Sequence, residues 1–270
     1  MKLALNGATT MRASLETDLA AASAAGFDYV EIWGAKIRDR STEDLKKLFA
    51  EANVPPLSIN SIEHITFRDA EAYERIKQQC RDWSRLAAAI ECPYIVVVPG
   101  RLPPGEADAR ERVVEESVHV LTELCDIAAE HGVALAFEFL GQPDCSVQTL
   151  DLADEIVRTA ARDNLGLVID SFHFYAGGSN VRMIEKLDPR SIYIFHINDA
   201  EDLPREQLED RHRLLPGLGI LQLREMIRAF RDIGYDDVAS VEIFRPEYWE
   251  RDPFQLALDA KVAAGTIVNA

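Results

Sequence analysis

LGLVIDSFHFYAGG, residues 165–178, joins an apolar strand to a polar ending. The run from Leu165 to Ile169 is typical of a strand that is buried on both faces. It nevertheless ends in Asp170, and His173 follows three residues later. A carboxylate and an imidazole at the end of such a strand indicate a functional site if other strands end in the same way. Three more of the strands that the sequence predicts do so.

Apolar runs of strand length occur eight times in the chain and alternate with longer segments of helical periodicity. The predicted strands are residues 3–7, 29–33, 56–60, 94–99, 133–139, 165–170, 192–197 and 238–244. Amphipathic helices are predicted at residues 15–25, 42–52, 70–89, 107–131, 150–161 and 221–233. Gly26, Gly132 and Gly234 stand just after three of these helices, where glycine commonly ends a helix.

This alternation predicts an α/β fold with parallel strands, because strands covered by helices on both sides are apolar throughout. Eight such units close into a (β/α)₈ TIM barrel, and 270 residues suit one barrel, for which roughly 250 are typical. A doubly wound open sheet is the alternative, but no GxGxxG motif opens a first helix. No linker or change in composition divides the chain, so residues 1–270 are predicted to form a single domain.

Polar side chains end the fifth to eighth predicted strands. They are Glu138, Asp170, His196 and Glu242. In a parallel barrel these strand ends carry the active site, so the four side chains are expected to converge. Three carboxylates beside one imidazole would repel one another in an apolar barrel mouth unless a cation lay between them. The pattern predicts one divalent metal ion, and the ligand types leave Mn²⁺, Mg²⁺, Co²⁺ and Zn²⁺ open.

Three further residues are predicted to contact a substrate. His173 follows Asp170 closely enough to reach a substrate hydroxyl as a hydrogen-bond donor or proton relay. Trp33 and Phe244, near the ends of the second and eighth strands, are candidates for the walls that exclude water from a reaction intermediate.

The formal net charge of −17 disfavours nucleic acids and anionic membrane surfaces and favours a small neutral substrate. Four widely spaced cysteines with no CxxC pair are typical of reduced thiols, which predicts a cytoplasmic protein. No apolar stretch approaches the roughly 20 residues that span a bilayer, and the first residues, MKLALNGATT, resemble neither a secretory signal nor a membrane anchor. A homo-oligomer is compatible with the sequence.

Several motifs together resemble the xylose isomerase-like barrel superfamily of sugar isomerases and epimerases, along almost the whole chain. They are EFLG at 138–141, GLVIDSFHF at 166–174, IFHINDAED at 194–202, PGLG at 216–219 and SVEIFRPEYW at 240–249. Within these motifs, DSFHF and VEIFRPEY favour the branch that isomerises inososes. The resemblance implies that one divalent metal ion is held by the four strand-end residues and chelates the ketone and a neighbouring hydroxyl of the substrate.

The resemblance also implies roles for individual residues. Glu138 and Glu242 would move protons, with the residue that removes the first proton left open. His173 and an arginine ahead of the PGLG turn would contact the substrate. DRHRLLPG offers both Arg211 and Arg213 for that contact, and Arg213, three residues before Pro216, is the favoured candidate.

The implied reaction moves the ketone of a cyclic polyol, 2-keto-myo-inositol, to the adjacent carbon by proton transfer through an enediol. Ketose 3-epimerase, hydroxypyruvate isomerase and inosose dehydratase share the metal and the first step, so they are the nearest alternatives, with a small polyol ketone or ketose as substrate. An abasic-site endonuclease would need more metal ligands and a basic surface. A non-catalytic sugar-binding barrel would need neither glutamate.

Overall fold

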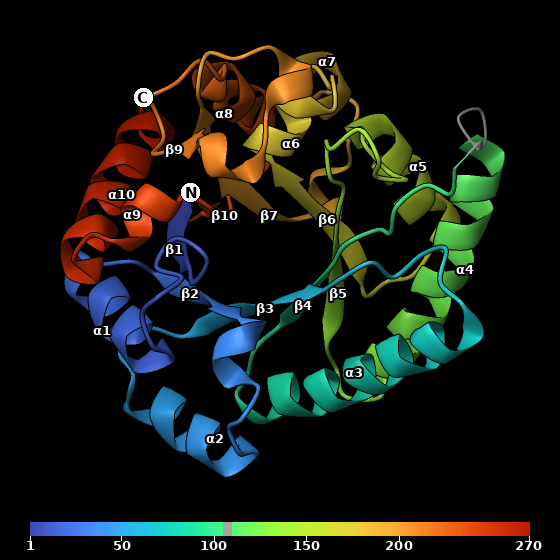
Figure 1. The fold of residues 1–270 in the computed structure, drawn as a ribbon, viewed down its shortest axis with the longest axis horizontal. Helices are drawn as coiled ribbons and strands as arrows, with labels where there is room; N and C mark the ends of the chain where they lie inside the picture. Colours follow the sequence, from blue (N-terminus) through green and yellow to red (C-terminus); the bar gives the residue numbers. More distant parts are fainter. Residues whose placement is uncertain (105–109) are drawn as a thin grey trace.

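The computed structural model describes residues 1–104 and 110–270, and it places eight parallel strands in a closed barrel (Figure 1). Around the barrel the strands follow the order β1, β10, β7, β6, β5, β4, β3 and β2. Their bounds are β1 (Lys2–Asn6), β2 (Tyr29–Trp33), β3 (Pro56–Ile62), β4 (Tyr94–Val97), β5 (Ala134–Glu138), β6 (Leu165–Asp170), β7 (Ile192–Ile197) and β10 (Val238–Val241). The predicted (β/α)₈ barrel is confirmed.

Helices surround the barrel and cover the outer faces of its strands (Figure 1). The longer ones are α1 (Leu15–Ala25), α2 (Thr42–Glu51), α3 (Ala70–Ala89), α4 (Arg110–Ala129), α5 (Leu150–Ala160), α8 (Leu223–Asp232) and α10 (Pro253–Val268). Gly26 ends α1 as expected, with a φ of 75° and its N–H donated to the carbonyls of Ala22 and Ser23. The predicted start of the fourth helix, at Ala107, lies outside the described residues. None of the helices in the described parts of the chain combines the length and apolarity that a membrane span requires.

Side chains along each strand point alternately into the barrel and out toward the helices. In β6, Leu167 and Ile169 pack in the large core between barrel and helices, whereas Val168 belongs to the smaller cluster inside the barrel. The inward set of this strand is therefore Gly166, Val168 and Asp170. The carboxylate ends β6 because the inward face opens there into the mouth of the barrel.

The ends of the predicted elements differ from the observed ones by at most three residues, a normal uncertainty where strands and helices fray. Larger differences are elements that the predicted ranges do not include. They are the long helix α10 and, among the shorter elements, α6 (Ser171–Ala176), α7 (Val181–Ile184), α9 (Pro246–Trp249) and the antiparallel pair β8 (Asp199–Ala200) and β9 (Arg213–Leu214). Of these, α6 and β9 matter for the site, because they carry His173 and Arg213.

Candidate active site and metal centre

The four polar residues at the ends of neighbouring barrel strands lie together. Glu138 ends β5, Asp170 ends β6, His196 lies in β7, and Glu242 directly follows β10. All four are buried, and one oxygen or nitrogen atom from each lies within 4.8 Å of the others. Because β5, β6, β7 and β10 are consecutive in the barrel, the predicted convergence follows from strand order.

The imidazole of His196 presents one nitrogen to this cluster and the other to a different carboxylate. Its Nδ1 lies 3.1 Å from Glu138 Oε1 and 3.2 Å from Glu242 Oε2. Its Nε2 lies 3.1 Å from Glu31 Oε1. Burial opposes a charge on this ring, but Glu242, Glu31 and Glu138 outweigh it and raise the pKa of His196 well above its usual value.

Glu31 lies in β2, and its side chain is fully buried. The groups that contact its carboxylate are all hydrogen-bond donors. Its oxygens accept from Ser58 Oγ at 2.6 Å, Asn60 Nδ2 at 2.9 Å and Asn6 Nδ2 at 3.2 Å, in addition to facing His196 Nε2. Burial alone would raise the pKa of Glu31, but His196 and the hydroxyl groups of Ser240 and Ser58 lower it to about 2. An ionised carboxylate therefore holds Nε2 of His196 as an N–H donor, which leaves Nδ1 as the nitrogen that faces the cluster.

Arg213 is fully buried in the same cluster. Its Nη1 donates to Asp170 Oδ2 at 2.8 Å and to Glu242 Oε2 at 3.0 Å, and its Nη2 donates to His173 Nε2 at 3.0 Å. The guanidinium also lies 5.0 Å from the ring centre of Phe244, which is a cation–π contact. Arg211 is instead 62% exposed and pairs with a surface glutamate. Of the two candidate arginines, the structure brings Arg213 and not Arg211 to the cluster.

His173 lies in α6 directly after the β6 carboxylate. Asp170 Oδ1 caps α6 by accepting the backbone N–H of His173 at 2.9 Å. Because arginine only donates, the bond from Arg213 makes Nε2 of His173 an acceptor and places the ring proton on Nδ1. Burial and the charge of Arg213 lower the pKa of His173, so the ring is neutral. Its Nδ1 is buried and has no hydrogen-bond partner among the described residues.

A cavity of about 270 Å³ opens over the cluster. Its walls include Glu138, Glu242, His173 and Arg213, together with both aromatic residues predicted from the sequence, Trp33 and Phe244. The rings of Trp33 and Phe244 meet edge to face with centroids 5.4 Å apart. The cavity has the size of a small ligand site, and it combines apolar rings with a few converging polar groups.

The donor set of the cluster fits one divalent metal ion. Burial raises the pKa of Glu138 to about 7, and Glu242 and Asp170 add to that rise, although His196 opposes it. The negative charge of the three carboxylates is thus only partly balanced by Arg213 and His196, which is the imbalance that a cation corrects. Three carboxylates and one imidazole nitrogen suit Zn²⁺, Mn²⁺, Co²⁺ or Mg²⁺.

Comparison with known proteins places this architecture in a family. The family model of the xylose isomerase-like TIM barrel matches residues 19–261. The chain belongs to the xylose isomerase-like TIM barrel family. As in TIM barrels generally, the polar cluster of this family member lies at the carboxyl ends of the strands, where the loops that follow them supply the walls.

Family members with strong similarity match the chain from end to end. The inosose isomerase of Bacillus velezensis is 38% identical over 275 residues, which cover 100% of this chain and 98% of the relative. The inosose isomerase of Bacillus subtilis is also 38% identical, over 278 residues with the same coverage. A crystal structure of the IolI protein with a bound zinc atom superposes with a TM-score of 0.95 at 37% identity, covering 100% of this chain and 98% of that one.

Some polar residues around the cluster are not predicted from the sequence. Besides Glu31, they include Asn198, whose Nδ2 donates to Asp170 Oδ2 at 2.7 Å, and Asp210, whose Oδ1 accepts from Arg213 Nη2 at 2.9 Å. A signal for Glu31 exists, since it is the single charged residue inside the apolar run YVEIW and lies on the same inward face as Tyr29 and Trp33. Asp210 begins a 3₁₀ helix of three residues, Asp210–His212, which is too short for a periodicity to indicate a direction.

Proposed function

We propose that this protein is an inosose isomerase, which moves the ketone of 2-keto-myo-inositol to the adjacent carbon. The observation that carries the proposal is the buried cluster of three carboxylates and one imidazole beneath a small-ligand cavity. This cluster occurs in a chain that matches inosose isomerases along its whole length. An isomerase of this kind acts on a small, sugar-like molecule.

In this proposal the metal ligands are Glu138, Asp170, His196 through Nδ1, and Glu242. When bound, a divalent metal ion acts as a Lewis acid toward the oxygen that becomes negative as a proton leaves the neighbouring carbon. Zinc is the ion to test first, because the solved structure described above holds a zinc atom. Mn²⁺, Co²⁺ and Mg²⁺ are compatible with the same donors.

Substrate contacts are assigned to the other residues that line the cavity. The Nδ1–H of His173 is a buried donor that has no acceptor in the described part of the chain, so a substrate hydroxyl or carbonyl would satisfy it. Arg213 fixes the acceptor role of His173 Nε2, and its charge faces the same cavity. Trp33 and Phe244 provide apolar walls that exclude water from the enediol.

Glu138 and Glu242 are the proposed proton-transfer groups. They approach His196 Nδ1 from β5 and β10, two strands that are separated in the barrel by β6 and β7. This separation allows one carboxylate to take the proton from carbon while the other, or His173, manages protons at carbon or oxygen. Each glutamate is also a proposed metal ligand, so its two roles have to be measured separately.

The test is conversion of 2-keto-myo-inositol in D₂O by the zinc-loaded protein, followed by NMR. We expect an inosose with its ketone shifted by one position and with deuterium at the carbon that has lost the carbonyl, because an enediol route exposes that proton to solvent exchange. Glu138→Gln and Glu242→Gln should each suppress conversion and label uptake, and metal analysis of both variants separates loss of the base from loss of the ion. Absence of conversion would overturn the proposal.

The same NMR experiment separates the nearest alternatives. A ketose 3-epimerase would invert a carbon next to the ketone and leave the ketone in place. An inosose dehydratase would release water, and hydroxypyruvate isomerase would act on a three-carbon acid. A non-catalytic sugar-binding barrel would convert none of these compounds. An abasic-site endonuclease has the least support, because a net charge of −17 repels a phosphate backbone.

We also propose a cytoplasmic location and no nucleic-acid or membrane partner. All four cysteines are free and buried, which suits a reducing compartment. A homo-oligomer remains part of the proposal, and analytical ultracentrifugation of the purified protein tests it.

A further inference from the structure

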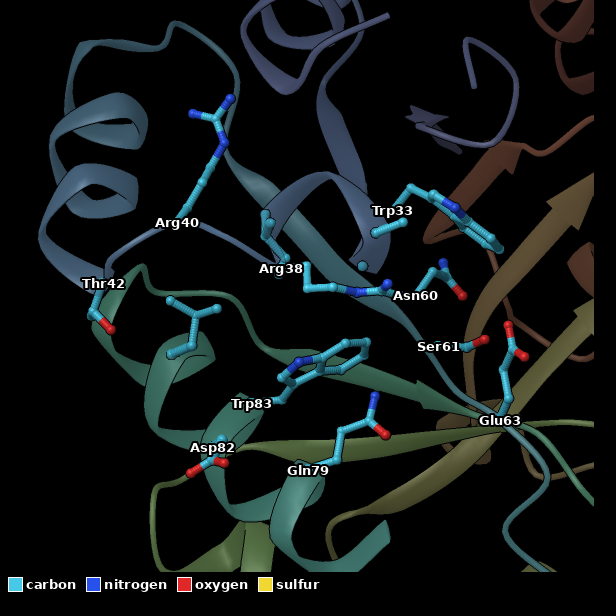
Figure 2. Close-up of a pocket in the computed structure, with 14 residues that line it drawn as sticks. Trp33, Arg38, Arg40, Thr42, Asn60, Ser61, Glu63, Gln79, Asp82 and Trp83 are labelled. Carbon is cyan, nitrogen blue, oxygen red and sulfur yellow. The ribbon is translucent and has the colours of Figure 1, made fainter. Parts of the chain in front are cut away.

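A second pocket adjoins the proposed catalytic cavity. It has a volume of about 560 Å³ and lies between the segment after β2 and helix α3 (Figure 2). Trp33, Asn60, Ser61 and Glu63 line both this pocket and the cavity over the cluster. The two spaces therefore meet along a shared wall at the ends of β2 and β3. A ligand in the cavity that reaches past these residues would enter the second pocket.

Two indole rings flank the second pocket. Figure 2 shows Trp33 and Trp83 on opposite sides, with Arg38 and Asn60 between them in this view. The six-membered ring of Trp83 lies so close to the backbone at Gly34 that a Cβ added there would come within 2.5 Å of it. Gly34 thus leaves the space in which Trp83 rests, so the ring has a set position although it is only partly buried.

The polar groups of the pocket balance one another in charge. Arg38 is exposed and makes no hydrogen bond or ion pair with the described residues, and Glu63 on the shared wall is likewise unpaired within them. Arg40 and Asp82 add one charge of each sign. Arg40 also forms an ion pair with Glu16, in which Nη1 lies 2.6 Å from Oε1. Two cations beside two carboxylates give no net attraction for a phosphate. Aromatic faces with separate donors and acceptors are what a neutral polyhydroxylated ring requires.

From these observations we infer that the Figure 2 pocket is a second sugar subsite, which holds a neutral glycosyl substituent while the ketone-bearing ring occupies the catalytic cavity. The inference rests on the proposed function for the occupant of the first site. It extends the substrate class from free inososes to glycosylated ones. In this arrangement the glycosyl ring lies against Trp83, and its hydroxyls meet Arg38 and Gln79.

The test compares two neutral probes by isothermal titration calorimetry of the zinc-loaded protein. The probes are myo-inositol and galactinol, its galactosyl derivative. We expect galactinol to bind about tenfold more tightly, which corresponds to one additional ring stacked on an aromatic face. Trp83→Ala and Arg38→Ala should each bring the ratio of the two dissociation constants close to one. Arg38 is exposed, so this variant keeps the test valid if Trp83→Ala fails to fold.

The matched control is Arg75→Ala, which removes the same charge from an exposed position on α3 that pairs with Glu71 and does not line the pocket. This variant should keep the wild-type ratio. Equal affinity for the two probes, or no detectable binding of galactinol, would overturn the subsite. So would a change of oligomeric state in Trp83→Ala while Arg38→Ala keeps the wild-type ratio, because the pocket would then hold a second copy of the chain.

Failure of the subsite is distinguishable from failure of the proposed function. The calorimetry measures binding and needs no turnover. A protein that prefers galactinol yet converts no inosose keeps the subsite and loses the proposed reaction. A protein that converts 2-keto-myo-inositol without preferring galactinol keeps the reaction and loses the subsite.

Discussion

Replacement of Glu31 by Gln should weaken zinc binding although Glu31 is not one of the four clustered ligands. Its carboxylate faces three N–H donors, from Asn6, Asn60 and His196, and the hydroxyl of Ser58. Only an acceptor can satisfy all four. The hydroxyl of Ser58 can rotate to accept from a glutamine amide, but the second amide proton would then face another N–H group.

The size of the effect follows from these contacts. Losing a hydrogen bond to a charged group costs about 1.5–3 kcal/mol. Removing the carboxylate behind a metal-bound histidine typically costs about 10–100-fold in metal affinity, which corresponds to about 1.4–2.7 kcal/mol. The two energies agree, so we expect the zinc dissociation constant of Glu31→Gln to be about 10–100-fold higher than that of the wild type.

Competition of zinc between the protein and a chromophoric chelator measures this change. Ser58→Ala is the matched control, because it deletes one bond to Glu31 at 2.6 Å and keeps the charge. We expect it to weaken zinc binding less than Glu31→Gln. A Glu31→Gln variant that folds normally and binds zinc as tightly as the wild type would refute the reasoning, because His196 would then need no carboxylate behind it.

Three further predictions concern the same chain. His196→Ala should lose zinc and turnover together, whereas His173→Ala should keep its zinc and lose about 10²–10⁴-fold in turnover; equal zinc loss in metal analysis of both would disprove the substrate role of His173. Arg213→Ala should lower the free energy of unfolding of the metal-free protein by about 3–5 kcal/mol, because it leaves buried carboxylates unpaired. Arg211→Ala should have no effect, and urea denaturation checks both. Burial raises the pKa of Asp18 to about 6, so the folded protein keeps a proton that the unfolded chain releases. The free energy of unfolding should therefore fall as the pH rises from about 4 to about 6, by about 3 kcal/mol from this group, and Asp18→Asn should flatten that part of the profile.

The barrel was predictable because its strands are apolar on both faces and its helices are not. LGLVID is an example, since its outward residues meet helices and its inward residues fill the barrel. The polar strand ends were predictable for a related reason: in a closed parallel barrel, sequence order determines which strand ends are neighbours. The assignment of residues 1–270 to one domain and the roles given to the site residues stay predictions.

The remaining features depend on contacts that sequence patterns do not encode. Arg211 and Arg213 lie two residues apart, and the choice between them depends on the pairing of β9 with β8, which sets Arg213 opposite Ala200. The position of Trp83 depends on the backbone of Gly34, which is distant in sequence. Both arrangements come from tertiary contacts between residues of different elements, which a repeating pattern within one element does not indicate.

The two carboxylate oxygens of Asp170 have different hydrogen-bonding roles, and together these roles restrict which residues can replace it. One oxygen caps α6, and the other accepts from Arg213 and Asn198 inside the cluster. Asparagine would keep the cap and lose the charge, while the longer glutamate would keep the charge and misplace the cap. Two independent selection pressures therefore act on one side chain. In a saturation library selected for growth that depends on this enzyme, position 170 should tolerate fewer substitutions than position 138, where the side chain caps no helix.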